Sequence, residues 1–156
     1  MLLEAAKILA TAILSAGLGG FWVSRWKASL DHAEKRIDDL CAEISKLADY
    51  GSEYWLLPQT DEKVAVLQAR LTSGMLRIAT IRVSLAGLVK GLNSDSIVQA
   101  EAAFIRVTTG GDFAVHNRLA SGANAAAVQH SASTIVVEIR RARMQALQGQ
   151  WFLPRV

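Results

Sequence analysis

The residues that could bind a metal or attack a substrate are few and lie far apart in the sequence. The three histidines are His32, His116 and His130, and the single cysteine is Cys41. None of the histidines stands at metal-ligand spacing from another histidine, the cysteine or an acidic cluster. A lone thiol forms no intramolecular disulfide, which fits a reducing compartment or simply an unneeded thiol. Cys41 lies beside the predicted stalk seam, so we expect it to be a buried structural thiol. We therefore predict no catalytic residue, no metal site and no cofactor.

Two further segments could contact phosphate groups. The sequence TTGGD at residues 108–112 offers backbone N–H groups, but neither the strand nor the lysine of a phosphate-binding loop flanks it, so we interpret it as a helix-capping turn. Arg140, Arg141 and Arg143 cluster near the end of a predicted helix, where cations complement the helix dipole. The same three arginines could contact RNA or anionic lipid head groups, and the sequence leaves these alternatives open.

The composition is that of one small domain with an unusually apolar chain. The protein has 156 residues, of which 51% are hydrophobic, and its formal net charge is +3. The length suits a single modest domain, and the hydrophobic content is high for a water-soluble one. The charge is too small and too evenly spread to predict nucleic-acid binding by itself.

The hydrophobic excess lies at the N-terminus, in MLLEAAKILATAILSAGLGGFWVSRWK. From Ile8 to Ser24 there is no charged residue, which corresponds to roughly 25 Å of helix and approaches the ~30 Å hydrocarbon core of a bilayer. A cleaved signal peptide fits less well, because bulky Phe21 and Trp22 stand where small residues should precede a cleavage site. We therefore predict a transmembrane helix over residues 1–24.

Basic residues flank this apolar run unevenly. Lys7 precedes its core, whereas Arg25, Lys27, Lys35 and Arg36 follow it closely. The positive-inside rule then places the N-terminus outside a bacterial inner membrane and the C-terminal part in the cytoplasm. The predicted interfacial anchors on the cytoplasmic side are Phe21, Trp22, Arg25, Trp26 and Lys27.

Small residues form two neighbouring rows at four-residue spacing on the predicted span, where a second helix could approach closely. The residues predicted to pack span against span are Thr11, Ala12, Ser15, Ala16, Gly19 and Gly20. Small residues are also common in spans that do not associate, which is the alternative. If the spans enclose an aqueous path, the polar residues that could line it are Glu4, Lys7 and Thr11.

An apolar stripe with a 3.5-residue period continues past the predicted span. Its members are Val23, Trp26, Leu30, Ala33, Ile37, Leu40, Ile44 and Leu47. No proline or glycine interrupts residues 21–50, so we predict one helix over residues 2–50, about 70 Å long, whose part from 25 to 50 is an amphipathic stalk. The stripe could form an oligomeric coiled coil or pack against later helices of the same chain, and three heptads do not decide between these alternatives.

The remaining residues, 51–156, have the pattern of a cytosolic helical bundle. Gly51 and Ser52 are predicted to end the first helix, and Thr60 to cap the second. The later predicted helices cover residues 61–90, 97–108 and 123–147, with a short additional one after Asp112. The predicted fold class is therefore all-α, with an N-terminal transmembrane helix, a long stalk helix and a small helical bundle.

Apolar residues at helical spacing define the core that these predicted helices would share. On the second helix they are Val64, Leu67, Leu71, Met75, Ile78, Ile81, Leu85, Leu88 and, just beyond it, Leu92. On the third helix, some combination of Val98, Ala102, Phe104 and Ile105 is predicted to be buried. On the last helix, the core residues are Val128, Ala132, Ile135, Val136, Ile139 and Leu147.

A single N-terminal span that runs into a small all-helical cytosolic domain resembles the membrane accessory protein of type VI-B CRISPR systems. The resemblance is one of layout over the whole chain, and it implies a HEPN-like bundle and assembly into a ring-shaped membrane pore. The ribonuclease signature of HEPN domains is Arg, four to six residues and then His, a spacing that Arg25 and His32 meet in RWKASLDH. This pair lies at the membrane exit, whereas the family pattern places it late in the bundle. The resemblance therefore implies that the catalytic pair is absent.

The sequence thus favours a homo-oligomeric inner-membrane effector of antiphage defence that permeabilises or depolarises the membrane as a pore. Its expected partners are membrane lipid, further copies of the chain, and a defence-system protein or RNA as trigger, and the sequence indicates no small-molecule ligand. The alternatives are a membrane-tethered scaffold that recruits a cytosolic partner and, with less support, a membrane-anchored HEPN-type ribonuclease. Trp151 and Phe152 near the C-terminus could dock on the bilayer or fill a groove between subunits.

Overall fold

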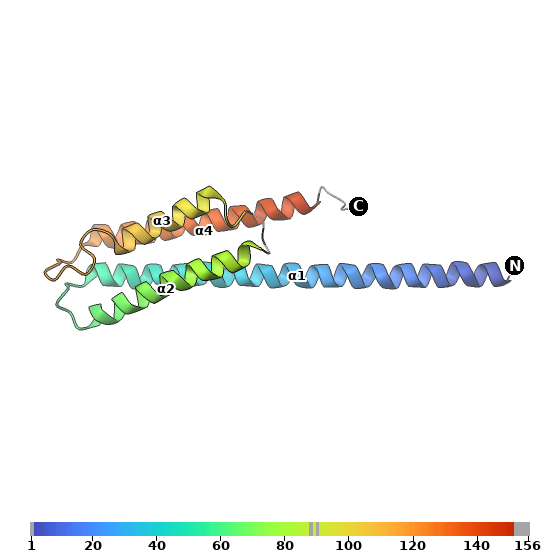
Figure 1. The fold of residues 1–156 in the computed structure, drawn as a ribbon, viewed down its shortest axis with the longest axis horizontal. Coiled ribbons are helices and arrows are strands. Elements are labelled where there is room, and N and C mark those ends of the chain that lie inside the picture. Colours follow the sequence, from blue (N-terminus) through green and yellow to red (C-terminus); the bar gives the residue numbers. More distant parts are fainter. Residues whose placement is uncertain (1, 88, 90, 152–156) are drawn as a thin grey trace. The chain divides into compact units, whose positions relative to one another are not determined.

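The computed structural model describes the backbone of residues 2–87, 89 and 91–151, and the side chains of residues 24–25, 27–28, 31–87, 89 and 91–146. The described backbone is all-α, which confirms the all-α part of the predicted fold class (Figure 1). Its helices are α1 (Leu2–Leu56), α2 (Lys63–Ala86), α3 (Asp95–Thr109) and α4 (Gly122–Trp151). The chain divides into two compact units, Met1–Lys35 and Arg36–Val156, which are described separately.

The predicted membrane span belongs to the first unit. Among the residues that the structure describes, none of the helices is both long enough and apolar enough to cross a membrane. Residues 1–23, which hold nearly all of the predicted span, lie outside the residues whose side chains are described. The span, its orientation and the inner-membrane location therefore remain predictions.

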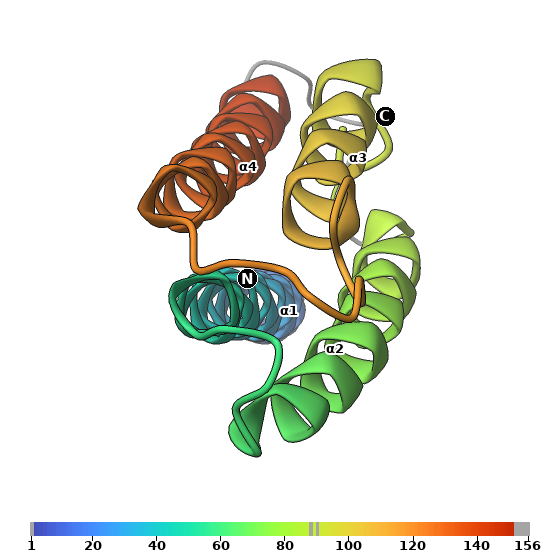
Figure 2. The same ribbon diagram turned by 90° about the vertical axis from the view of Figure 1, so that its left-hand side faces the viewer.

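The second unit is a bundle of the C-terminal part of α1 with α2, α3 and α4. Viewed end-on, α1, α2, α3 and α4 follow one another around a shared core (Figure 2). Four members of the predicted stalk stripe are buried in this core, namely Ile37, Leu40, Ile44 and Leu47. For these residues the structure shows packing against the chain's own later helices, the second of the two alternatives. Val23, Trp26 and Leu30 of the same stripe lie outside the described side chains.

Helix α1 does not end at Gly51 and Ser52, as predicted, but continues to Leu56. Gly51 is buried, and a β-carbon placed on it would lie 2.9 Å from Cγ1 of Val128 and 3.0 Å from Cγ2 of Thr108. The glycine is therefore where α1 passes close to α3 and α4, and not where the helix stops. The following Tyr54 belongs to the buried core and not to a connecting loop.

The predicted inner faces of α2 and α4 are confirmed at most of their described positions, but Ile81 and Val136 are only half-buried. On α2 and beyond it the buried residues include Val64, Leu67, Leu71, Met75, Ile78, Leu85 and Leu92, and on α4 they include Val128, Ala132, Ile135 and Ile139. Leu88 and Leu147 lie outside the described side chains. The predicted Thr60 cap is wrong, because α2 begins at Lys63 with Glu62 at the N-cap position, and Lys63 N–H donates to Oδ1 of Asp61 at 2.9 Å.

The inner face of α3 differs from the prediction. Val98 and Ala102 are exposed, while Ile97, Ala100 and Phe104 are buried together with two polar residues, Glu101 and Thr108. The buried positions recur every three or four residues, so the helix has the expected period with a different phase. The phase was missed because a buried glutamate and threonine interrupt the apolar pattern.

The short helix predicted after Asp112 is absent from the described backbone, where residues 110–121 form turns. Gly110 leaves α3 with an extended backbone, and Gly111 and Ala114 have positive φ angles of 59° and 67°. This segment crosses the end of α1, since Ser121 N–H donates to the carbonyl of Trp55 at 2.7 Å. The turn therefore closes one end of the bundle.

Candidate functional site

The residues predicted to act in the membrane fall largely outside the described side chains. They are Glu4, Lys7, Thr11, Ala12, Ser15, Ala16, Gly19, Gly20, Phe21, Trp22 and Trp26. Of the predicted interfacial anchors, Arg25 and Lys27 are described, and both are exposed on α1. The predicted roles of this set in packing, pore lining and anchoring remain predictions.

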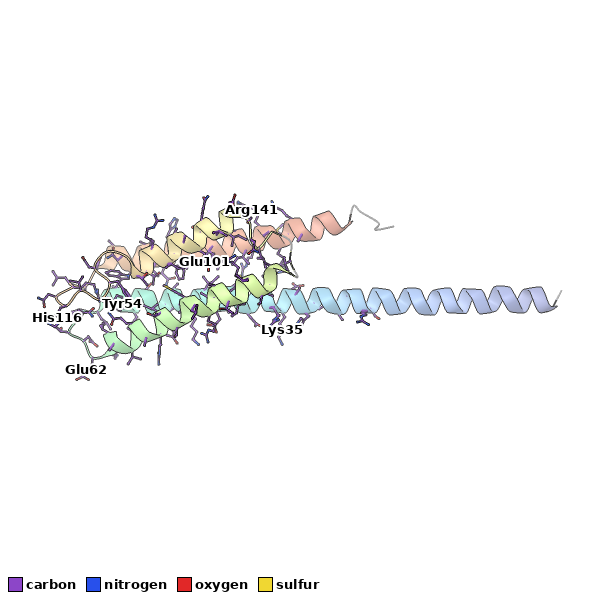
Figure 3. All side chains as sticks on the ribbon, in the orientation of Figure 1. Lys35, Tyr54, Glu62, Glu101, His116 and Arg141 are labelled. Carbon is purple, nitrogen blue, oxygen red and sulfur yellow. The ribbon has the colours of Figure 1, made fainter. Side chains whose placement is uncertain are left out.

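The histidines lie on separate elements and are exposed, with His116 at the turn that closes the bundle (Figure 3). His32 is exposed on α1 in the same unit as Arg25. Within the described residues, no group of three or more histidine, cysteine, aspartate or glutamate side chains could hold a metal ion.

The predicted basic cluster near the end of α4 is divided among different partners. Arg141 Nη1 lies 2.6 Å from Oε1 of Glu138, and Arg143 Nη1 lies 4.0 Å from Oδ1 of Asp38. Arg140 contacts Cys41, which is buried as predicted. Burial raises the pKa of the Cys41 thiol above its ordinary value, and the neighbouring Arg140 partly opposes that shift. The three arginines thus have different partners within the chain, and their contact with RNA or lipid head groups remains a prediction.

One buried arginine holds the end of α1. Arg118 is 5% exposed, and its Nη2 donates to the carbonyls of Tyr54 and Leu57 at 2.8 Å each. Its guanidinium lies 4.3 Å from the ring centroid of Tyr54 and 4.8 Å from that of Trp55. The C-terminal carbonyls of a helix lack partners within it and carry partial negative charge, so this cation caps α1. Arg118 is therefore structural.

A second cation, which is half-buried, joins α2 to α3. Arg82 Nε lies 2.5 Å from Oε2 of Glu101, whose side chain points into the bundle (Figure 3), and Arg82 Nη1 donates to Oδ1 of Asn93 at 2.8 Å. The side chains of the ion pair are 12% and 7% exposed. A buried glutamate is costly unless paired, so this contact explains why Glu101 occupies a core position of α3.

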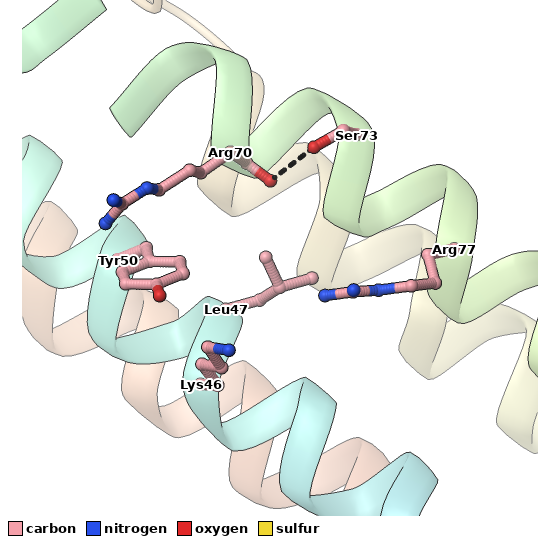
Figure 4. Close-up of a pocket in the computed structure, with 6 residues that line it drawn as sticks. All are labelled: Lys46, Leu47, Tyr50, Arg70, Ser73 and Arg77. Atoms are coloured by element: carbon pink, nitrogen blue, oxygen red, sulfur yellow. Dashed lines mark hydrogen bonds between the residues drawn. The ribbon is translucent and has the colours of Figure 1, made fainter. Parts of the chain in front are cut away.

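A further group of cations lines a groove between α1 and α2, and these cations are exposed. The groove has a volume of about 400 Å³ and is lined by Lys46, Leu47, Tyr50, Arg70, Ser73 and Arg77. Figure 4 shows Arg70 and Arg77 extending from α2 on either side of Leu47, with Lys46 and Tyr50 on α1 facing them. A basic groove of this size can receive a small anionic ligand.

Within the groove, only one of the three cations is neutralised by an acid. Arg77 Nη2 lies 2.5 Å from Oε2 of Glu43. Arg70 and Lys46 instead lie over the ring of Tyr50, at 5.2 Å and 6.0 Å from its centroid. No carboxylate among the described residues pairs with either of them. These two cations therefore keep their hydrogen-bond donors available to solvent or to a ligand.

The groove is not among the sites predicted above, although the sequence contains a usable signal for it. Arg70, Ser73 and Arg77 are spaced by three and four residues, so they share one face of a helix. Lys46 and Tyr50 are four residues apart and share a face of α1 in the same way. What the spacing does not give is the pairing of the two helices, which sets these faces opposite each other.

Comparisons of the chain with models of protein families, with curated proteins and with solved structures produced no match.

Proposed function

We propose that the protein is a homo-oligomeric, membrane-anchored helical effector that permeabilises the bacterial inner membrane. The observation that carries the proposal is the uncharged run from Ile8 to Ser24, with most of the flanking cations on its C-terminal side. A run of this length and composition is typical of a membrane span, and the cation bias is typical of a cytoplasmic C-terminal part.

The described bundle supports this proposal through the helix that it shares with the run. Helix α1 extends from Leu2 to Leu56, and its later residues, from Ile37 to Trp55, supply core positions of the bundle. A change in packing around that part of α1 therefore acts on the same helix that carries the proposed span. In this proposal the bundle receives the trigger and the span carries out the membrane function.

The layout of the chain is the basis for assigning the protein to antiphage defence, through its resemblance to the type VI-B accessory protein. On this proposal several spans associate through the small-residue rows, and Gly19 and Gly20 allow the closest approach. The polar residues Glu4, Lys7 and Thr11 would line the path between them.

The proposal is tested by placing a large side chain in the helix–helix contact. We expect Gly19→Ile and Gly20→Ile to abolish growth inhibition and dye leakage from cells, because a branched side chain keeps the spans apart. Gly87→Ile is the matched control, since Gly87 is exposed and a β-carbon there meets nothing within 4 Å. Circular dichroism should show the same helix content in all three variants. Wild-type leakage from both span variants would refute the proposed pore.

A membrane-tethered scaffold is the second candidate, and the outer face of α2 favours it. Leu76 and Val83, seven residues apart on that face, are 72% and 60% exposed, and a partner could cover them. Replacing the span with an unrelated monomeric one distinguishes the two candidates. A scaffold should keep its function after the exchange, whereas a pore should lose it.

A further inference from the structure

We infer that the groove between α1 and α2 binds the terminal phosphate group of a small phosphorylated ligand. The inference rests on the described bundle alone and does not depend on the proposed membrane function. Its starting point is a difference among the arginines of the bundle. A carboxylate or backbone carbonyls of the chain bind each of Arg82, Arg118 and Arg141. In contrast, Arg70 contacts only the ring of Tyr50, and Lys46 lies above the same ring.

The charge of the groove specifies the kind of anion. Lys46, Arg70 and Arg77 contribute three positive charges and Glu43 contributes one negative charge, which leaves a balance of two positive charges. A phosphomonoester or the end of a polyphosphate carries close to two negative charges at neutral pH, as phosphorylated side chains do. A phosphodiester in a nucleic-acid backbone carries one negative charge. The groove therefore matches a terminal phosphate better than an internal one.

The donors of the groove also suit a phosphate. Guanidinium groups such as those of Arg70 and Arg77 donate two parallel hydrogen bonds to the oxygens of a phosphate, and an ammonium group adds a point charge. Ser73 Oγ now donates to the backbone carbonyl of Arg70 at 3.2 Å, and a rotation about one bond would turn it to a ligand. Leu47 lies between the two arginines and gives the groove an apolar floor (Figure 4).

Two sources could supply such a phosphate, a soluble nucleotide or the phosphomonoester head group of a lipid. Binding is measured by isothermal titration calorimetry on the full chain in nonionic detergent, without added metal. The probes are adenosine triphosphate, glycerol 3-phosphate as the lipid head group, and a short single-stranded RNA without terminal phosphates. Saturable binding of either of the first two, weakened by added salt, supports the inference and identifies the source.

Substitutions then locate the binding. Arg70→Gln and Arg77→Gln should each weaken binding of the favoured probe about tenfold or more, because each removes charge-assisted hydrogen bonds. Glu43→Gln should strengthen it several-fold, because it removes the carboxylate that competes for Arg77. Arg106→Gln is the matched control, since Arg106 is an exposed arginine on α3 and does not line the groove. Its affinity should equal that of the wild type.

Three results would overturn the inference. The first is the absence of binding by both adenosine triphosphate and glycerol 3-phosphate. The second is an equal loss of affinity in Arg70→Gln and Arg106→Gln, which would show a general effect of net charge. The third is preferential binding of the RNA, which would assign the groove to a nucleic-acid backbone. None of these measurements depends on dye leakage, so the groove and the pore are tested separately.

Discussion

The stretch of α1 from Lys46 to Trp55 has two sides that differ in how the chain uses them. On the side of α3 and α4, Gly51 permits close approach and Trp55 Nε1–H donates to the carbonyl of Thr108 at 3.2 Å. On the side of α2, Lys46 and Tyr50 border an open groove. One side buries its polar groups with partners, whereas on the other side Lys46 and Arg70 have no acidic partner among the described residues.

This difference separates cations that hold the fold from cations that are available for binding. A buried cation is costly unless the chain supplies acceptors, as it does for the two Nη atoms of Arg118. An exposed cation such as Arg70 is satisfied by water, so its position adds little to stability. We therefore expect substitutions on the two sides to have opposite consequences, with large effects on folding on one side and on ligand binding on the other.

The largest effect is expected for Arg118→Met, which keeps an apolar stem and removes the guanidinium. The variant leaves the carbonyls of Tyr54 and Leu57 without their donor and loses the contact with two aromatic rings. We expect the free energy of unfolding to fall by about 3 kcal/mol, because hydrogen bonds to charged groups contribute about 1.5 to 3 kcal/mol each and are partly coupled. Urea denaturation of the full chain at fixed detergent concentration measures this. A loss below about 1 kcal/mol would show that water replaces Arg118 at the end of α1.

A smaller effect is expected for Gly51→Ala. Alanine favours a helix over glycine by about 1 kcal/mol, but the added β-carbon would meet Cγ atoms of Val128 and Thr108, whose β-branched side chains are stiff. Overpacking a core costs about 1 to 3 kcal/mol, so we expect a net loss of about 1 kcal/mol. The same denaturation experiment measures it.

The control for Gly51→Ala is Gly87→Ala. A β-carbon on Gly87 meets nothing within 4 Å, and its φ of −71° is open to any residue. This variant should be neutral or gain up to about 1 kcal/mol. If both alanines stabilise the protein equally, α1 is less tightly packed against α3 and α4 than the structure shows. Adding Val128→Ala to Gly51→Ala should remove part of the clash, so the two changes should not be additive.

How much of this architecture follows from sequence depends on whether the signal is local. The helical class and the inner faces of α2 and α4 follow from apolar residues at helical spacing, which is a local pattern. The end of α1 does not follow from a local pattern. Glycine is a residue type that commonly ends helices, but tertiary packing keeps Gly51 within α1. Which face of α3 is buried could not be predicted from the sequence either. Glu101 is buried on that face because Arg82 pairs with it from another helix.

The groove shows the same limit for function. The basic residues of α4 form an obvious cluster in sequence, yet in the structure Arg141 and Arg143 face acids of the chain and Arg140 faces Cys41. Arg70 and Lys46 are far apart in sequence and become neighbours only through the pairing of α1 with α2. Clustering along the chain therefore revealed neither the different partners of the α4 arginines nor the cations that the pairing of α1 with α2 brings together.

The smallest loss of stability is expected for Arg70→Gln. This variant is also the sharpest test of the difference between the two sides of α1. The side chain is exposed, has no acidic partner among the described residues and contributes one contact over the Tyr50 ring, a type worth about 0.5 to 1 kcal/mol at exposed sites. Glutamine removes this contact but keeps much of the apolar stem, so the free energy of unfolding should fall by no more than about 0.5 to 1 kcal/mol. Denaturation in the same buffer measures this, with Arg118→Met as the reference for a structural arginine. A loss comparable to that of Arg118→Met would mean that Arg70 holds α2 against α1, and its exposed donors would then no longer indicate a binding site.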